Sequence, residues 1–141
     1  MKILILCTGN SCRSQMAHGF LQFFDSEILV ASAGTEPAER VNPMAIEVMG
    51  ETGIDISEHW PNPVEKFLDQ EWDFVVTVCD DARESCPVFN GRVKKKLHIG
   101  FDDPSKATGD EDFIKSEFIR VREEIRRAFL DFYSKEILPL L

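Results

Sequence analysis

The sequence predicts an α/β fold: a single domain with a four-stranded parallel sheet and helices on both faces. Three observations support this prediction. Short β-rich runs alternate along the chain with segments of helical periodicity. The 141 residues suffice for one domain with one core, and no linker, repeat or low-complexity segment divides residues 1–141. Hydrophobic residues make up 43% and charged residues 29%, as in ordinary globular proteins.

The first strand is expected at Lys2–Leu6, an apolar and β-branched run. Ser14–Phe24 places its apolar residues on one broad helical face, and Ile28–Ser32 reads as the second strand. Two pairs of asparagine and proline each predict a helix start, the asparagine as N-cap and the proline as first helical residue: Asn42-Pro43 and Asn62-Pro63. We expect these helices to end near residues 52 and 68, with Gly53 as the C-cap of the first.

The run Phe74–Cys79 is the most β-rich of the chain and is expected as a central, buried strand. For Asp80–Val88 the pattern leaves a helical turn and an irregular loop open. Lys96–Phe101 is expected as the fourth strand, with the lysines of 94–96 at its solvated start. The segment Asp112–Ile137 is the clearest amphipathic helix, with these residues on one face: Ile114, Phe118, Val121, Ile125, Ala128, Phe129 and Phe132.

Residues Cys7–Arg13 form a polar loop between the first strand and the first helix. N–H groups of such a loop and of the first helical turn lack intrahelical partners, and the helix dipole favours negative charge there. Gly9 can adopt the positive φ that an anion-binding nest needs. A thiol at Cys7, near the Arg13 guanidinium, ionises more easily and becomes a nucleophile. The alternative is a buried cysteine at a strand end and an arginine in a surface turn.

The stretch CTGNSCRSQMA, residues 7–17, resembles the thioredoxin-coupled arsenate reductases, which share their fold and anion loop with the low-molecular-weight protein tyrosine phosphatases. Further segments resemble the reductases, so the resemblance covers nearly the whole chain: SAGTEP, VNPMAIEVM, GIDIS, VVTVC, FDDP and FIRVREEIRRA. The resemblance implies a low-molecular-weight phosphatase-like fold for residues 1–141.

The formal net charge of −9 makes nucleic acid a poor partner. No apolar run approaches the roughly 20 residues that span a bilayer, so we expect no membrane segment. The N-terminus runs as a strand directly into the anion loop, which argues against a removable signal. We therefore expect a cytoplasmic protein that acts as a monomer.

There are four cysteines (Cys7, Cys12, Cys79 and Cys86) and three scattered histidines. In a cytoplasmic protein such cysteines are free thiols or form a transient, catalytic disulfide. No pair has C-x2-C spacing and no cluster of zinc ligands appears. Some relatives hold a potassium ion near the loop with a carboxylate where His18 stands, and we expect neither a metal nor a cofactor.

Cys79 and Cys86 distinguish the two groups of relatives. A phosphatase needs one thiol, whereas reducing arsenate consumes two electrons, so a second thiol must attack the first. The stretch VTVCDDARESCP resembles the redox segment of the reductases, with the same seven-residue interval between cysteines. The alternative is a core thiol at Cys79 and an incidental loop residue at Cys86. The sequence after Asp103-Pro104 (DPSKATGD) lacks the aromatic residues that phosphatases of this class carry there.

Asp103 is the candidate general acid, because Pro104 stiffens the turn that carries its carboxyl group. Both groups of relatives have an Asp-Pro at this place in the chain. The alternatives are an Asx turn at a strand end, or Asp102 as the acid. Because ligands bind beyond the carboxyl ends of parallel strands, we expect Cys7, Cys79 and Asp103 to share one edge of the sheet.

By this resemblance, arsenate (or phosphate or sulfate as an analogue) binds the loop through these residues: Thr8, Gly9, Asn10, Ser11, Cys12, Arg13 and Ser14. Cys7, supported by a hydrogen bond from Ser14, attacks arsenic while Asp103 protonates the departing oxygen. Cys79 then attacks Cys7 and releases arsenite, and Cys86 attacks Cys79. The resulting disulfide is reduced by thioredoxin. Asn10 is expected to brace the loop, and Cys12 to have no step.

Two rival functions remain from the sequence alone. The first is a phosphatase that acts on phosphate monoesters, including phosphotyrosine. The second is a non-enzymatic thiol sensor that binds oxyanions without turnover.

Overall fold

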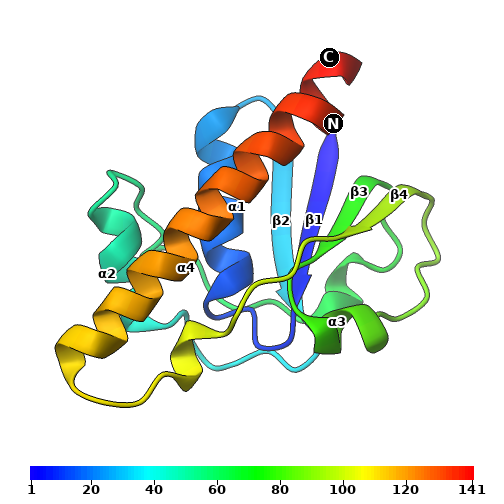
Figure 1. The fold of residues 1–141 in the computed structure, drawn as a ribbon. Helices are drawn as coiled ribbons and strands as arrows, with labels where there is room; N and C mark the ends of the chain where they lie inside the picture. Colours follow the sequence, from blue (N-terminus) through cyan, green and yellow to red (C-terminus); the bar gives the residue numbers. More distant parts are fainter.

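The computed structural model describes all 141 residues and contains one four-stranded parallel sheet with the strand order β2-β1-β3-β4 (Figure 1). The strands are β1 (Lys2–Cys7), β2 (Leu29–Gly34), β3 (Trp72–Thr77) and β4 (Val93–His98). The predicted α/β fold with a four-stranded parallel sheet is confirmed.

The two central strands, β1 and β3, carry the most apolar sequences, because both of their faces are covered. Ile3, Leu4, Ile5 and Leu6 are fully buried. β4 is an edge strand, and its lysines 94–96 are exposed. This polar edge explains why the fourth strand was expected three residues too late, at 96–101. The third strand likewise begins and ends two residues before the predicted range, 74–79.

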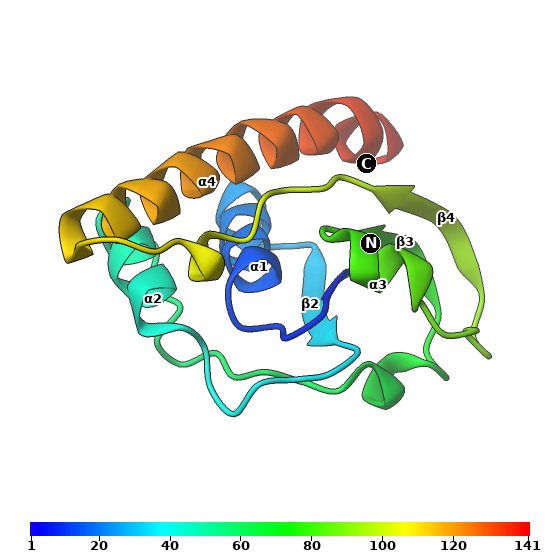
Figure 2. The ribbon, with the colours of Figure 1, turned by 60° about the horizontal axis from the view of Figure 1, so that its bottom comes forward.

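The long helices are α1 (Arg13–Phe24), α2 (Pro43–Gly50) and α4 (Glu111–Phe132). Helices α1 and α4 pack against each other on one side of the sheet, with α2 beside α4 (Figure 2). The predicted start of α2 is confirmed, since the Asn42 side chain accepts a hydrogen bond from the Met44 N–H at 2.8 Å. Helix α4 buries five residues of its predicted face and continues as a π-helical turn (Tyr133–Ile137) and a last 3-10 turn (Leu138–Leu140). None of the helices is both long and apolar enough to cross a bilayer.

Three short elements complete the fold: η1 (Val64–Phe67), α3 (Asp80–Glu84) and η2 (Pro104–Lys106). The second side of the sheet is covered by the segment that carries η1, so the two helical layers are unequal (Figure 2). The cap expected at Asn62 is wrong: Pro63 is the N-cap residue of η1. The Asn62 amide instead donates to the Ser32 and Trp60 carbonyls.

The carboxyl ends of all strands point to one edge of the sheet (Figure 1). The loop after β1, helix α3 after β3 and η2 after β4 gather at this edge (Figure 2). This is where the sequence places its candidate site.

Candidate active site

The carbonyl groups of the loop between β1 and α1 are hydrogen-bonded to another segment of the chain. Its backbone N–H groups are therefore left to face the inside of the loop. The carbonyls of Thr8, Gly9 and Ser11 accept hydrogen bonds from N–H groups of the chain segment 36–42, at 2.8–2.9 Å. Helix α1 begins at Arg13 with no side-chain cap, so its first N–H groups are also free of intrahelical partners. A loop with free N–H groups at a helix N-terminus is an arrangement that can bind an anion.

Asn10, and not Gly9, supplies the positive φ of the loop, with φ 51°. An asparagine tolerates this region because its side chain bonds locally. Its fully buried amide donates to Ser14 Oγ at 2.7 Å and accepts the Asn62 N–H at 2.9 Å. The expectation for Gly9 is therefore wrong, whereas the bracing expected of Asn10 is present.

A second layer of side chains holds the loop from behind. Gln15 donates from Nε2 to the carbonyls of Asn10 and Trp60, so its Oε1 accepts from His59 Nδ1, which lies 3.0 Å away. His59 stacks on His18 with ring centroids 4.6 Å apart. Burial, and secondarily His59, lowers the pKa of His18 to about 4. Gln15 lies in the stretch CTGNSCRSQMA, but the sequence gives no sign that His59 and His18 stand behind it, since their partners are distant in the chain.

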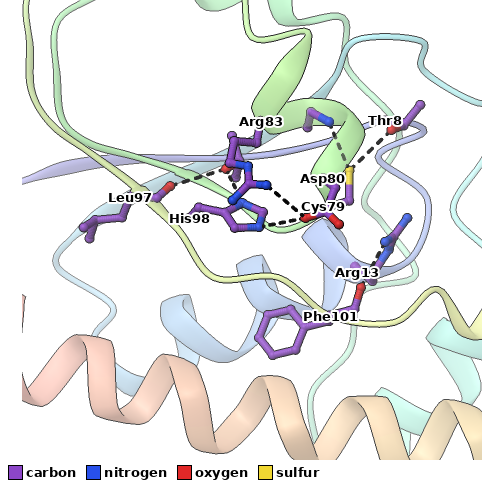
Figure 3. A network of polar contacts seen from close by, with 10 residues as sticks. Thr8, Arg13, Cys79, Asp80, Arg83, Leu97, His98 and Phe101 are labelled. Atoms are coloured by element: carbon purple, nitrogen blue, oxygen red, sulfur yellow. Dashed lines mark hydrogen bonds and ion pairs between the residues drawn. The ribbon is translucent and has the colours of Figure 1, made fainter.

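Cys7, at the end of β1, and Cys79, the N-cap residue of α3, are both buried and lie next to each other, close enough for each thiol to shift the pKa of the other. The Cys79 sulfur also accepts from the Ala82 N–H at 3.4 Å and lies 3.3 Å from Thr8 Oγ1 (Figure 3). The two sulfurs are thus brought together from positions 72 residues apart, as predicted from the parallel topology.

The surroundings of the two thiols shift their pKa values in opposite directions. The Cys7 side chain, Thr8 and the Ala82 N–H lower the pKa of Cys79 to about 5, against the effect of burial. Cys79 and burial raise the pKa of Cys7 above its usual value. Arg13 favours the Cys7 thiolate, as expected from the sequence, but Cys79 and burial outweigh its effect on the pKa of Cys7.

Arg13 connects the loop to the turn after β4. Its Nη1 donates to the Phe101 carbonyl at 3.1 Å, and its Nη2 lies 3.4 Å from Asp103 Oδ2 (Figure 3 shows the Phe101 contact). The Arg13 Nε–H is buried without a hydrogen-bond partner. An orphaned donor of this kind costs free energy until an acceptor fills the site.

Asp103 contacts Arg13, whereas Asp102 lines the outer mouth of the site. Asp103 Oδ1 accepts from the Ser105 N–H and hydroxyl, an Asx-type turn, while Oδ2 faces Arg13. Asp102 is largely exposed and pairs with Arg120 on α4 at 3.3 Å. Asp103 therefore forms an Asx turn and also lies at the site, so these two readings of the sequence do not exclude each other.

The other predicted residues divide into those near the site and those outside it. Ser14 is buried, but its Oγ accepts from Asn10, and the expected bond to Cys7 is not formed. Burial, and secondarily Asp103, raise the pKa of Cys12 to about 12, which keeps this thiol neutral. Cys86 lines a different cavity of about 380 Å³, beside Arg83, Lys96 and His98, and its Sγ contacts the Pro87 carbonyl at 3.7 Å. The structure does not bring Cys86 to Cys79.

The mouth of the site is a cavity of about 580 Å³ with a strongly acidic lining. Only two residues of its lining are hydrophobic, and Phe101 is the only aromatic one. The lining consists of Arg13, Cys79, Asp80, Asp81, Gly100, Phe101, Asp102, Asp103, Lys106 and Glu124. As expected from the sequence after Pro104, no aromatic pair flanks the opening.

The chain is similar to proteins of known family. Residues 2–137 match the family described as low molecular weight phosphotyrosine protein phosphatase. An arsenate reductase 2 of Staphylococcus haemolyticus is 47% identical over 94% of this chain and 96% of that protein. A solved structure described as an arsenate reductase in the phosphate binding state has a TM-score of 0.80 and 31% identity, over 95% of this chain and 97% of the other. A thioredoxin-dependent arsenate reductase of Corynebacterium glutamicum has a TM-score of 0.61 and 26% identity, over 96% of this chain and 63% of that one.

Proposed function

The chain belongs to the low molecular weight phosphotyrosine protein phosphatase family, and we propose that it uses this fold to reduce arsenate to arsenite. The observation that carries the proposal is that two buried thiols, Cys7 and Cys79, lie next to each other beside Arg13. Ester hydrolysis needs one nucleophilic thiol, whereas a two-electron reduction needs a second thiol within reach of the first.

In this proposal the oxyanion binds the inward N–H groups of the loop and the Arg13 guanidinium. The unpaired Arg13 Nε–H supports this role, since a bound oxygen would satisfy it. A similar protein captured in a phosphate binding state supports an oxyanion of this shape. Because the mouth is acidic, affinity must come from the loop dipoles and Arg13 and not from the general field of the protein.

The first step joins Cys7 to arsenic. Cys7 passes its proton to Cys79 and attacks arsenic as the thiolate, and one oxygen leaves as water after Asp103 donates a proton. Cys79 then attacks Cys7 Sγ, its proton passing to an oxygen of the departing group. The As–S bond breaks with its electron pair remaining on arsenic, so As(V) becomes As(III) and a Cys7–Cys79 disulfide forms.

The second step transfers the disulfide to Cys86. The Cys86 thiolate attacks Cys79 Sγ, the Cys7–Cys79 bond breaks, and Cys7 leaves as a thiolate. Residues 79–85 span α3 with its caps, so an intact helix at 1.5 Å per residue separates Cys79 from Cys86 by roughly 10 Å. A disulfide needs Cα atoms about 4.4–6.8 Å apart. Helix α3 must therefore unwind for this step.

A dithiol reductant then reduces the Cys79–Cys86 disulfide, and we propose thioredoxin for this role. The similarity to a thioredoxin-dependent arsenate reductase supports it. The chemistry requires the disulfide to become accessible, which unwinding of α3 would also provide.

The decisive experiment compares Cys79→Ser with wild type in two assays. We expect Cys79→Ser to lose thioredoxin-coupled arsenate reduction while retaining any hydrolysis of p-nitrophenyl phosphate. Arg126→Lys, on the surface of α4 and outside the site, is the control and should leave both activities intact.

Equal loss of both activities in Cys79→Ser would favour the phosphatase instead, whose requirements Cys7, Arg13 and Asp103 would meet. Oxyanion binding in the wild type without any turnover would favour the thiol sensor.

A further inference from the structure

His98, the last residue of β4, lies between β3 and α3 and contacts both (Figure 3). Its Nδ1 lies 2.8 Å from Thr77 Oγ1, at the end of β3, and its Nε2 lies 3.2 Å from Asp80 Oδ1, in the first turn of α3. Asp80 also lies within 3.8 Å of the Arg83 guanidinium. None of these contacts belongs to the anion loop.

The groups that surround His98 require a proton on its Nε2. The Asp80 carboxylate only accepts, so the contact requires an Nε2–H. Thr77 Oγ1 carries one hydrogen, which goes either to His98 Nδ1 or to the Leu97 carbonyl at 3.4 Å. In both arrangements His98 ties Asp80 to the sheet.

Asp80 follows Cys79 directly, so this tie acts on the residue whose sulfur must stay near Cys7. Helix α3 has only five residues, and an isolated helix of that length has no stability of its own. The Cys79 sulfur accepts the Ala82 N–H only while the first turn of α3 is folded. Holding Asp80 therefore holds the Cys79 sulfur.

We infer that His98 is a positioning residue that bridges Thr77 and Asp80: the Asp80 half of this bridge keeps α3 folded and Cys79 against Cys7, and its opening accompanies transfer of the disulfide to Cys86. This inference rests on the proposed thiol relay. The bridge has opposite effects on the two exchange steps: it favours the attack of Cys79 on Cys7, and it retards the attack of Cys86 on Cys79.

The test uses two variants that each keep half of the bridge. The His98→Gln amide reaches the place of Nε2 and keeps the Asp80 contact, whereas the His98→Asn amide reaches only the place of Nδ1 and keeps the Thr77 contact. The full-length reduced proteins are mixed with excess arsenate without thioredoxin and quenched by alkylation at intervals. Mass spectrometry then follows the Cys7–Cys79 and Cys79–Cys86 disulfides separately, with Cys86→Ser versions isolating the first.

We expect His98→Asn to slow formation of the Cys7–Cys79 disulfide about fivefold and to speed its conversion to Cys79–Cys86 by a similar factor, as the strength of an exposed ion pair allows. His98→Gln should stay near wild type in both steps. Equal behaviour of the two variants, or a change of both steps in the same direction, overturns the inference.

Hydrogen exchange in the reduced proteins tests the bridge without any turnover. The N–H groups of Ala82, Arg83 and Ser85, which bond within α3 or to its cap, should exchange about fivefold faster in His98→Asn than in His98→Gln. If wild type forms no arsenite, the proposed function fails, and this measurement still decides whether the bridge exists. Equal exchange in the two variants contradicts the bridge.

Discussion

The anion loop and the segment from α3 to β4 lie side by side at one edge of the sheet but are held very differently. In the loop, Asn10, Ser14 and Gln15 are buried and joined by hydrogen bonds between side chains and backbone. In the other segment, α3 has five residues, Val88 is 84% exposed, and the only hydrogen bond of the Cys86 thiol is a weak one to the Pro87 carbonyl. This contrast fits the proposed function. The well-braced loop, the rigid half, would bind the oxyanion, and the loosely held half from α3 to β4 would change conformation so that its thiols can exchange disulfides.

The largest effect is expected from breaking recognition in the rigid half. Arg13→Lys keeps the charge but loses the planar fork and the Nε–H, so arsenate kcat/KM should fall about 10²–10³-fold. Arg126→Lys, on the surface of α4, is the control and should change this value less than twofold. A loss below about tenfold for Arg13→Lys would mean that charge alone suffices in the loop.

Removing the brace of the loop should cost stability. Asn10→Ala loses two buried hydrogen bonds and places an alanine at positive φ, so the free energy of unfolding should fall by about 3 kcal/mol. Asn10→Gly loses the same bonds without the backbone strain and should cost about 1 kcal/mol less. Urea unfolding measures both, and equal losses would show that the positive φ carries no strain here.

Acid should weaken the rigid half through His18. The pKa of His18 is about 4 when folded, below its usual 6.5, so the unfolded chain binds a proton that the folded one refuses. Its contribution is therefore constant above pH 6.5 and is lost as pH falls from 6.5 to 4, by about 2 kcal/mol at pH 5. His18→Gln should reduce the loss of unfolding free energy between pH 7 and pH 5 by this amount. An unchanged loss in the variant would show that His18 is accessible to protons.

The smallest effect is expected in the loosely held half, from α3 to β4, and it should be local. Arg83→Gly lowers helix propensity inside α3 by about 1 kcal/mol relative to Arg83→Ala, while both remove the contact to Asp80. Amide exchange within α3 should be faster in the glycine variant, with the unfolding midpoint in urea nearly the same for both. A clear drop of that midpoint in Arg83→Gly alone would show that α3 belongs to the cooperative core.

The sequence was most informative where local chemistry determines structure. Asn42 and Pro43 predict the start of α2 because capping depends on neighbours in the chain. The meeting of Cys7 and Cys79 followed from parallel topology, since two strands ending at one edge bring their last residues together.

It was least informative where long-range partners decide. The positive φ fell on Asn10 because Ser14 and Asn62 satisfy its amide, and Asn62 is 52 residues away. The predicted position of β4 was three residues too late. Its three consecutive lysines do not alternate with apolar residues, because this edge strand is exposed to solvent. The low pKa of Cys79 depends on Cys7, Thr8 and the Ala82 N–H. No spacing in the sequence indicates that Thr8 and Ala82 contact this sulfur.

Gly34, at the end of β2, determines which parts of the site can vary. A methyl group on Gly34 would lie 2.4 Å from the Thr8 carbonyl oxygen, so even alanine would push the loop out of place. Position 34 therefore has no room for a side chain, because main chain packs directly on main chain beneath the loop. At the outer mouth, by contrast, Asp102 and Glu124 pair with Arg120 on α4 and not with the loop. Variation among relatives of this chain is therefore expected in the outer mouth and not beneath the loop.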